Sequence, residues 1–304
     1  MLIIKYRAFF FWLTGIILVA AIGSLAFFGL PLSIDFTGGS LVEVAYQDAR
    51  PEISVLKERV ASAGFADVSV RESGETGVTI RAHTLTPAEH DTLLAALRGD
   101  AAMALTELRF SSIGPSLGSE LAIKALYAIA AVMLAIVLYI AVVFRKVSKP
   151  VPSWGYGIVV IAMLAIDIIV PAGFFAAYAH FTGAQADALF VVALLALLGY
   201  CVNDVIIVFD RVRERLHLNL QKNAKEPFET TVGVSIDQTL GRSINTSLTV
   251  ALALLAIIVF GAEATRDFAL VMLVGVVIGT FSSICRSAPL LIPIAHSFEK
   301  KKKA

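Results

Sequence analysis

The chain has 304 residues, of which 58% are hydrophobic, and its formal net charge at pH 7 is +1. Its mean hydropathy of +0.81 exceeds what a soluble globular domain requires and predicts an integral membrane protein. The near-neutral charge gives no electrostatic reason to expect nucleic-acid binding. Cys201 and Cys285 both lie in apolar segments, so we expect small core residues rather than a disulfide.

Known catalytic and cofactor motifs are missing from the sequence. The five histidines are scattered without metal-ligand spacing, and there is no Ser/His/Asp set, no P-loop and no dinucleotide-binding glycine motif. We therefore expect no enzyme activity, no bound metal and no cofactor.

The first apolar run, residues 8–30, follows Lys5 and Arg7, an order that can also indicate a signal peptide. The run is longer than a typical signal core, and about 20 apolar residues suffice to cross about 30 Å of hydrocarbon. We predict an uncleaved membrane anchor.

Residues 31–118 form the one long polar segment, and their pattern predicts a small α+β domain. The expected elements are a strand at 39–47, a helix at 51–64, strands at 67–72 and 77–82, a helix at 86–99 and a strand at 103–113. Thr86, Pro87 and Glu89 form a capping-box signature at the start of the second helix. This β-α-β-β-α-β order is typical of a ferredoxin-like split βαβ sandwich, and we expect a docking or handling module.

Six apolar stretches predict membrane-spanning helices. They lie near residues 9–29, 121–144, 157–180, 187–209, 245–262 and 268–292. The expected parts are an N-terminus and first span at 1–30, an extracytoplasmic domain at 31–118, a five-helix bundle at 119–296 and a basic tail at 297–304.

The loop charges predict the orientation of the spans. Basic residues are concentrated at the N-terminus, in "RKVSK" at 145–149, in the 210–243 loop and in "KKKK" at 300–303, whereas the loops at 181–187 and 261–267 share one Arg. By the positive-inside rule, both termini are cytoplasmic and residues 31–118 lie outside the cytoplasm.

A carboxylate, Asp204, interrupts the fourth span in "LLGYCVNDVIIVFDRVRER", residues 197–215. A charge near the bilayer centre costs about 2.5–3.5 kcal/mol on insertion scales, so such residues usually face a bundle interior and have a function. The span is expected to end near residue 209, which places Asp204 in its cytoplasmic half. Tyr200 and Asn203 add a hydroxyl and an amide beside the carboxylate.

The polar start of the fifth span offers a partner for Asp204. In "LGRSINTSLTV", one helical stripe carries Arg242, Asn245, Thr246 and Thr249. An Arg keeps its charge, whereas a desolvated Asp can become neutral. The pair would let Asp204 alternate between a protonated form and an Arg242-paired ionised form, as in a proton relay. A static ion pair that fixes helix packing is the alternative.

Three further features of the spans need an interpretation. Asp167, in "AIDIIV" of the third span, is either a second relay member or a hydrogen-bonded structural residue. Gly275, Gly279 and Ser283 recur every four residues in the sixth span and predict close helix contact. Arg286 is expected to extend its side chain to the cytoplasmic interface.

Taken together, these motifs resemble the SecD/SecF family. The matching segments are "IDFTGGS" (34–40), "SSIGPSLGSEL" (111–121), "GYCVNDVIIVFDRVRER" (199–215), "QTLGRSINTS" (238–247) and "RDFALVMLVGVVIGTFSSI" (266–284). The resemblance covers essentially the whole chain. It implies an RND-like bundle of six transmembrane helices with a small α+β ferredoxin-like external domain.

The resemblance also implies a function. A family member of this kind is an auxiliary subunit of the bacterial Sec translocase in the cytoplasmic (inner) membrane. With SecD, it would use the proton motive force to complete export of unfolded polypeptides through the SecYEG channel. The expected partners are SecD, SecYEG with YajC, the translocating polypeptide and membrane lipid.

The same resemblance assigns roles to individual residues. Asp204 takes the place of the family's proton-coupling carboxylate, and Arg242 takes the place of its basic partner. Asp167 occupies the Asp of a His-Asp motif in which Ile166 replaces the His.

Two other functions stay open at this point. One is a proton-driven exporter of small molecules or lipids of the RND kind, which predicts a larger external porter region with an apolar cleft. The other is a purely structural membrane scaffold.

Overall fold

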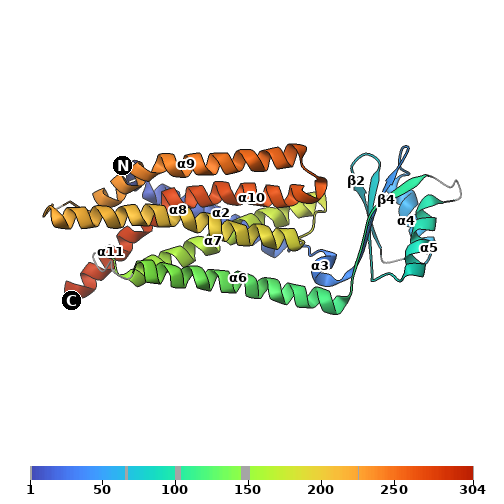
Figure 1. Ribbon diagram of the computed structural model, residues 1–304, viewed down its shortest axis with the longest axis horizontal. Helices are drawn as coiled ribbons and strands as arrows, with labels where there is room; N and C mark the ends of the chain where they lie inside the picture. The colour runs from blue at the N-terminus through green and yellow to red at the C-terminus, as the bar shows by residue number, and fades with distance from the viewer. Residues whose placement is uncertain (1, 66–67, 100–103, 145–150, 225, 304) are drawn as a thin grey trace. The chain divides into compact units, whose positions relative to one another are not determined.

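The computed structural model describes residues 2–65, 68–99, 104–144, 151–224 and 226–303. The basic segment 145–149 lies outside the described residues, as do the first residues of the predicted strands at 67–72 and 103–113. The chain divides into two compact units (Figure 1). The first unit comprises Met1–Leu30, Tyr127–Ala184 and Leu189–Ala304, and the second comprises Pro31–Leu126 and Gln185–Ala188.

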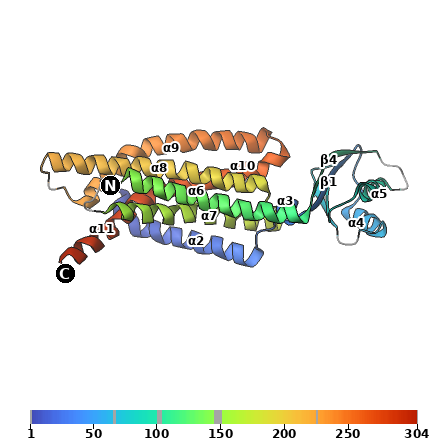
Figure 2. The same ribbon diagram turned by 60° about the horizontal axis from the view of Figure 1, so that its bottom comes forward.

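Long helices build the first unit, where α7, α8 and α10 run alongside one another in both views (Figures 1 and 2). The helices are α1 (Leu2–Lys5), α2 (Arg7–Phe28), α6 (Pro115–Val143), α7 (Ser153–Thr182), α8 (Ala188–Gln221), α9 (Phe228–Phe260), α10 (Glu263–Ser282) and α11 (Ala288–Lys303). A π-helical turn, η1 (Ser283–Ser287), joins α10 to α11. Within the described residues, six helical stretches are long and apolar enough to cross a membrane, which confirms the predicted number of spans.

The fourth and fifth spans belong to longer helices than their hydropathy predicts. α8 continues to Gln221 and α9 already begins at Phe228. The added turns are amphipathic: Val212 and Val232 are fully buried, whereas Arg211 and Arg213 are about two-fifths exposed. Hydropathy alone misses such turns because their polar face lowers the average. Asp204 therefore lies near the middle of a continuous helix rather than near its end.

Aromatic and small residues pack the interior of this unit. The Tyr156 ring stacks on Phe144 at 5.1 Å between centroids and meets Phe209 edge-on at 5.2 Å. Gly275 lies against Leu197 and Gly279 against Cys201, so closely that neither glycine has room for a Cβ atom. The predicted close helix contact along this face of α10 is confirmed.

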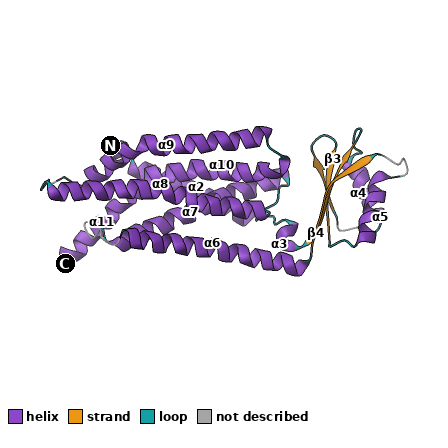
Figure 3. Ribbon diagram, viewed as in Figure 1, coloured by secondary structure: helices purple, strands orange, loops and turns teal. Residues whose placement is uncertain are grey.

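The second unit contains a four-stranded sheet with two helices on one face (Figure 3). The elements are α3 (Ile34–Thr37), β1 (Gly39–Tyr46), α4 (Ile53–Ser62), β2 (Ser69–Ser73), β3 (Gly77–Ala82), α5 (Pro87–Arg98) and β4 (Leu105–Ile113). The strand order is β2-β3-β1-β4, and every neighbouring pair is antiparallel. This is the predicted ferredoxin-like topology.

The core of this unit forms where the alternating strand residues meet the helices. Fully buried side chains come from the strands and from both helices: Val42, Val44, Val78 and Ile80, with Leu56, Leu93 and Leu97. The predicted capping box is present, because the Glu89 backbone N–H donates to Thr86 Oγ1 and the Thr86 backbone N–H donates to Glu89 Oε2. The hydrogen bonds from Thr86 hold the pKa of Glu89 below its ordinary value.

The motif segments at 34–40 and 111–121, which border the domain, lie against each other. Gly38 has a φ of +75°, and a Cβ atom there would lie 2.6 Å from Pro115 Cα. A Cβ atom on Gly118, in the first turn of α6, would lie 2.6 Å from the Gly38 nitrogen. Both positions require glycine because backbone atoms fill the space.

The segment before β1 also binds the turn that precedes α8. Ser33 N–H donates to the Ala186 carbonyl at 2.9 Å, and Ala186 N–H donates to the Pro31 carbonyl at 2.8 Å. Asp35 Oδ2 accepts a 2.9 Å hydrogen bond from the N–H of Ala188, the first residue of α8. A carboxylate at this end is favourable because a helix N-terminus carries partial positive charge.

We predict that Gly118→Ala destabilises the protein and that Gly114→Ala, in the same segment, does not. The clash with the Gly38 backbone costs about 1–3 kcal/mol, which outweighs the gain of up to about 1 kcal/mol from replacing a helical glycine. Nothing lies within 4 Å of a Cβ on Gly114. Thermal unfolding of the two purified variants in detergent measures the difference, and equal midpoints would contradict the close packing.

Candidate functional site

Asp204 is held inside the helix bundle. It is only 2% exposed, and within the described residues its buried Oδ2 accepts no hydrogen bond. The positive charge of Arg242 acts on the carboxylate, yet no ion pair or hydrogen bond joins the two side chains in the described part of the chain. An ionisable group inside a membrane-spanning bundle is costly to bury and usually has a function.

A chain of hydroxyl groups lies one helical turn from Asp204. Tyr200 of α8 donates a 2.7 Å hydrogen bond to Ser247 Oγ of α9. Thr280 Oγ1 of α10 lies 2.5 Å from the same Ser247 oxygen and 2.7 Å from the Val276 carbonyl oxygen. Three helices therefore meet through hydroxyl groups beside the buried carboxylate.

The predicted polar stripe of α9 lies mostly at the surface of the single chain. Arg242, Asn245 and Thr249 are exposed, and Thr246 is half-buried. The Thr246 and Thr249 hydroxyls donate to carbonyl groups of their own helix. Asn203, predicted beside Asp204, is exposed as well. The face of α9 that is buried therefore does not carry the predicted polar stripe.

The prediction that Arg286 extends to the cytoplasmic interface is wrong. Arg286 is 2% exposed, and its Nη2 lies 3.7 Å from Oδ1 of Asp167, which is 1% exposed. Its guanidinium also lies 5.8 Å from the centre of the Phe281 ring. Arg286 belongs to the π-helical turn η1, and this wider turn directs its side chain into the bundle rather than along the helix axis.

The Asp167–Arg286 pair forms a second buried polar cluster. The side chains of Ser282 and Cys201 lie beside the carboxylate. In the described part of the chain, however, both Asp167 oxygens and the Nε and Nη2 atoms of Arg286 lack hydrogen bonds of normal geometry. Buried ions with unsatisfied atoms are costly and are often found where water or a proton takes part in function.

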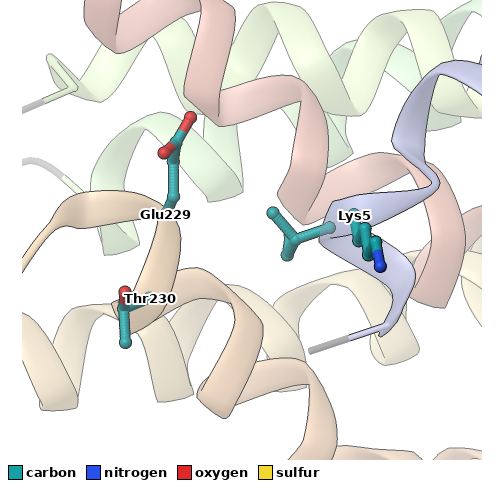
Figure 4. A pocket seen from close by; sticks show the side chains of 4 residues that line it. Lys5, Glu229 and Thr230 are labelled. Atoms are coloured by element: carbon teal, nitrogen blue, oxygen red, sulfur yellow. The ribbon is translucent and has the colours of Figure 1, made fainter.

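A surface pocket lies apart from both carboxylates. It is lined by Ile4, Lys5, Glu229 and Thr230, and Figure 4 shows Lys5 and Glu229 projecting from two different helices. Arg7 forms a 3.0 Å ion pair with Glu229 at this place. None of these residues belongs to the buried clusters, so the pocket contributes nothing to their chemistry.

A bundle of six membrane-length helices, with a ferredoxin-like domain between the first two spans and carboxylates inside, defines an RND-like membrane protein. Residues 94–297 match the family described as protein export membrane protein SecD/SecF, C-terminal, and residues 23–49 match the SecD/SecF GG motif. The chain therefore belongs to the SecD/SecF family of protein export membrane proteins.

Its similarity to individual members extends over nearly the whole chain. The protein translocase subunit SecF of Thermobaculum terrenum is 36% identical, across 95% of this chain and 92% of that protein. The SecF subunit of Anaerolinea thermophila is 37% identical over the same shares. The crystal structure of SecDF, a translocon-associated membrane protein from Thermus thermophilus, matches with a TM-score of 0.82 and 29% identity, across 95% of this chain and 38% of that chain.

Sequence reasoning missed Ser247, Thr280 and the inward direction of Arg286. Serine and threonine are common in membrane helices, so two single hydroxyls give no signal until their contacts are known. The π-helical turn that directs Arg286 inward has no simple sequence signature.

We predict that Arg286→Gln strongly destabilises the protein and that Asp167→Asn added to it restores most of the loss. Removing one partner of a buried ion pair typically costs about 3–5 kcal/mol, whereas removing both charges is nearly neutral. Thermal unfolding in detergent compares the single and double variants.

Arg266→Gln is the matched control, because Arg266 is exposed at the start of α10. A single Arg286 variant as stable as this control would show that the pair does not form.

Proposed function

We propose that the chain is an auxiliary subunit of the bacterial Sec translocase that acts with SecD. In this proposal it uses the proton motive force to complete export of unfolded polypeptides across the cytoplasmic membrane, after their passage through SecYEG. Membership of the SecD/SecF family and the similarity to subunits named SecF support this role. Association with YajC and with membrane lipid belongs to the same proposal.

The proposed topology places both termini in the cytoplasm and residues 31–118 outside it. The basic residues at the end of α8, among them Arg211, Arg213 and Arg215, support this orientation. α8 then runs from the outer side at Ala188 to the cytoplasmic side at Gln221, with Asp204 near the middle.

The observation that carries the proton-driven step is the buried Asp204 Oδ2, which lies in the middle of a membrane-length helix and has no hydrogen-bond partner among the described residues. A proton taken up from outside neutralises Asp204 and removes its attraction to Arg242. Release of the proton toward the cytoplasm restores the charge. The two protonation states therefore favour different packing of α8 against α9.

The available energy is sufficient for such a switch. One elementary charge that crosses the membrane potential yields about 2.3 kcal/mol per 100 mV. A bias of a few kcal/mol moves a two-state equilibrium from mostly one state to mostly the other. The external domain would use this bias to retain polypeptide that has already crossed. Asp167 is proposed as a second proton-coupling carboxylate, paired with Arg286.

We predict that Asp204→Asn abolishes the stimulation of export by a proton gradient, because an amide cannot exchange a proton. Preprotein translocation into inverted membrane vesicles, with and without an imposed gradient, measures the effect. Asp237→Asn is the matched control, since this carboxylate lies on α9 but is exposed. Gradient-stimulated export by the Asp204 variant at the rate of the unchanged protein would refute the proposal.

A further inference from the structure

The buried face of α9 carries a hydroxyl group at every fourth residue. We call this set the hydroxyl row; its members are Thr231, Ser235, Thr239, Ser243 and Ser247. Each member is at most 8% exposed. Residues four apart are neighbours on a helix surface, displaced by about 40° around the axis, so the row winds along α9 from its start to the level of Tyr200.

Three contacts show how α8 lies along α9. Tyr200 binds Ser247 at 2.7 Å, Arg211 Nε binds Gln238 Oε1 at 2.7 Å, and Asn219 Nδ2 binds Thr231 Oγ1 at 3.2 Å. The residue numbers rise on α8 while they fall on α9, so the two helices are antiparallel.

The contact between Tyr200 and Ser247 brings Ser243 to the level of Asp204. Asp204 is one turn beyond Tyr200 on α8, and Ser243 is one turn before Ser247 on α9. Ser243 is fully buried, and within the described residues neither its Oγ nor Asp204 Oδ2 has a hydrogen-bond partner. Two buried polar atoms without partners, each one turn from the same Tyr200–Ser247 hydrogen bond, need a water molecule or a shared proton to satisfy them.

The rest of the row leads from this site to a carboxylate at the end of the helix pair. Thr239 and Ser235 donate to the carbonyl groups of Ser235 and Thr231, at 3.0 and 2.7 Å. Thr231 donates to Glu226 Oε2 at 3.2 Å. Hydrogen bonds from Arg215 hold the pKa of Glu226 below its ordinary value, so this group is an ionised acceptor at neutral pH.

The spacing of the row suits a water-linked path. Four residues of helix rise by about 6 Å, which is about the length of two successive O–H···O hydrogen bonds through one water. Direct transfer between neighbouring hydroxyls is excluded by this distance. One water between each pair of hydroxyls would connect them.

Val208 and Val212, on the stretch of α8 that follows Asp204, are both fully buried. A proton-driven cycle needs such an apolar stretch between the two sides, since a permanently hydrated path would leak.

From these observations, we propose that the hydroxyl row is the route by which the proton leaves Asp204 toward the cytoplasm, with Ser243 as the first relay group. The Asp204 carboxyl gives its proton to a bridging water. Each hydroxyl or water along the row then accepts one proton and passes another on, so that a proton emerges beside Glu226. Asp204 ends as a carboxylate, and only O–H bonds are broken and formed. This inference rests on the proposed function of Asp204.

A packing role for the row makes a different prediction. Small residues at four-residue spacing also allow close approach of helices, and for that purpose Ala serves as well as Ser. Valine and threonine have nearly the same shape but differ by a methyl in place of a hydroxyl. Ser243→Val and Ser243→Thr therefore share any packing strain, and only the threonine variant keeps the relay group.

The test measures proton release from inverted membrane vesicles that contain the chain together with SecD. The vesicles are loaded with acidic buffer, and a pH-sensitive dye outside reports protons that emerge on the cytoplasmic face. We expect release about tenfold or more slower in Ser243→Val, with Ser243→Thr close to the unchanged protein and Ser243→Ala slowed as well. Thr230→Val is the control, because Thr230 lies on α9 outside the row and lines the surface pocket.

Equal release rates in Ser243→Val and Ser243→Thr, in vesicles where Asp204→Asn abolishes release, would overturn the relay and leave the row a packing feature. Normal release by Asp204→Asn would instead overturn the proposed function itself. The two failures are therefore distinguishable in one set of vesicles.

Discussion

The proposed chemistry depends on one constraint, a carboxyl group held in an apolar helix bundle without a cation at contact distance in the described part of the chain. A permanently charged Asp204 would be too costly there, and a permanently neutral one could do no work. Asp204 lies near the middle of the long α8, the glycines of α10 bring the helices close, and the Tyr200–Ser247 hydrogen bond lies one turn away. Proton exchange is the way in which such a group can respond to a membrane potential.

The two buried carboxylates have different surroundings, and this difference suggests different roles. Asp167 has a fixed cation, because Arg286 lies 3.7 Å away and both side chains are nearly inaccessible. Arg242, in contrast, lies at the surface of the chain and acts on Asp204 only from a distance. A cation that can approach and withdraw suits a switch, whereas in the enclosed pair any proton exchange by Asp167 would be coupled to the packing of α7 against η1.

Much of the fold could be predicted from the sequence because its signals are local. Thr86, Pro87 and Glu89 mark a helix start by themselves, and strand alternation fixed the order of the ferredoxin-like unit. Asp204 can be recognised from the sequence because a carboxylate in an apolar run is anomalous wherever it lies. The direction of Arg286 and the place of Ser243 at the level of Asp204 could not be predicted in this way, because they depend on a π-helical turn and on the register between two helices. The four-residue repeat of the hydroxyl row is visible in the sequence, but its meaning follows only from what lies opposite.

Protonation of Asp204 itself is the most direct measurement. Infrared difference spectroscopy of the purified complex with SecD, recorded across a range of pH, detects protonated buried carboxyl groups through their C=O stretching band. We expect a band that disappears as the pH rises, that is missing in Asp204→Asn, and that persists in Asp237→Asn. An identical set of titrating bands with and without the Asp204 carboxyl would contradict the central claim that this group binds and releases the proton.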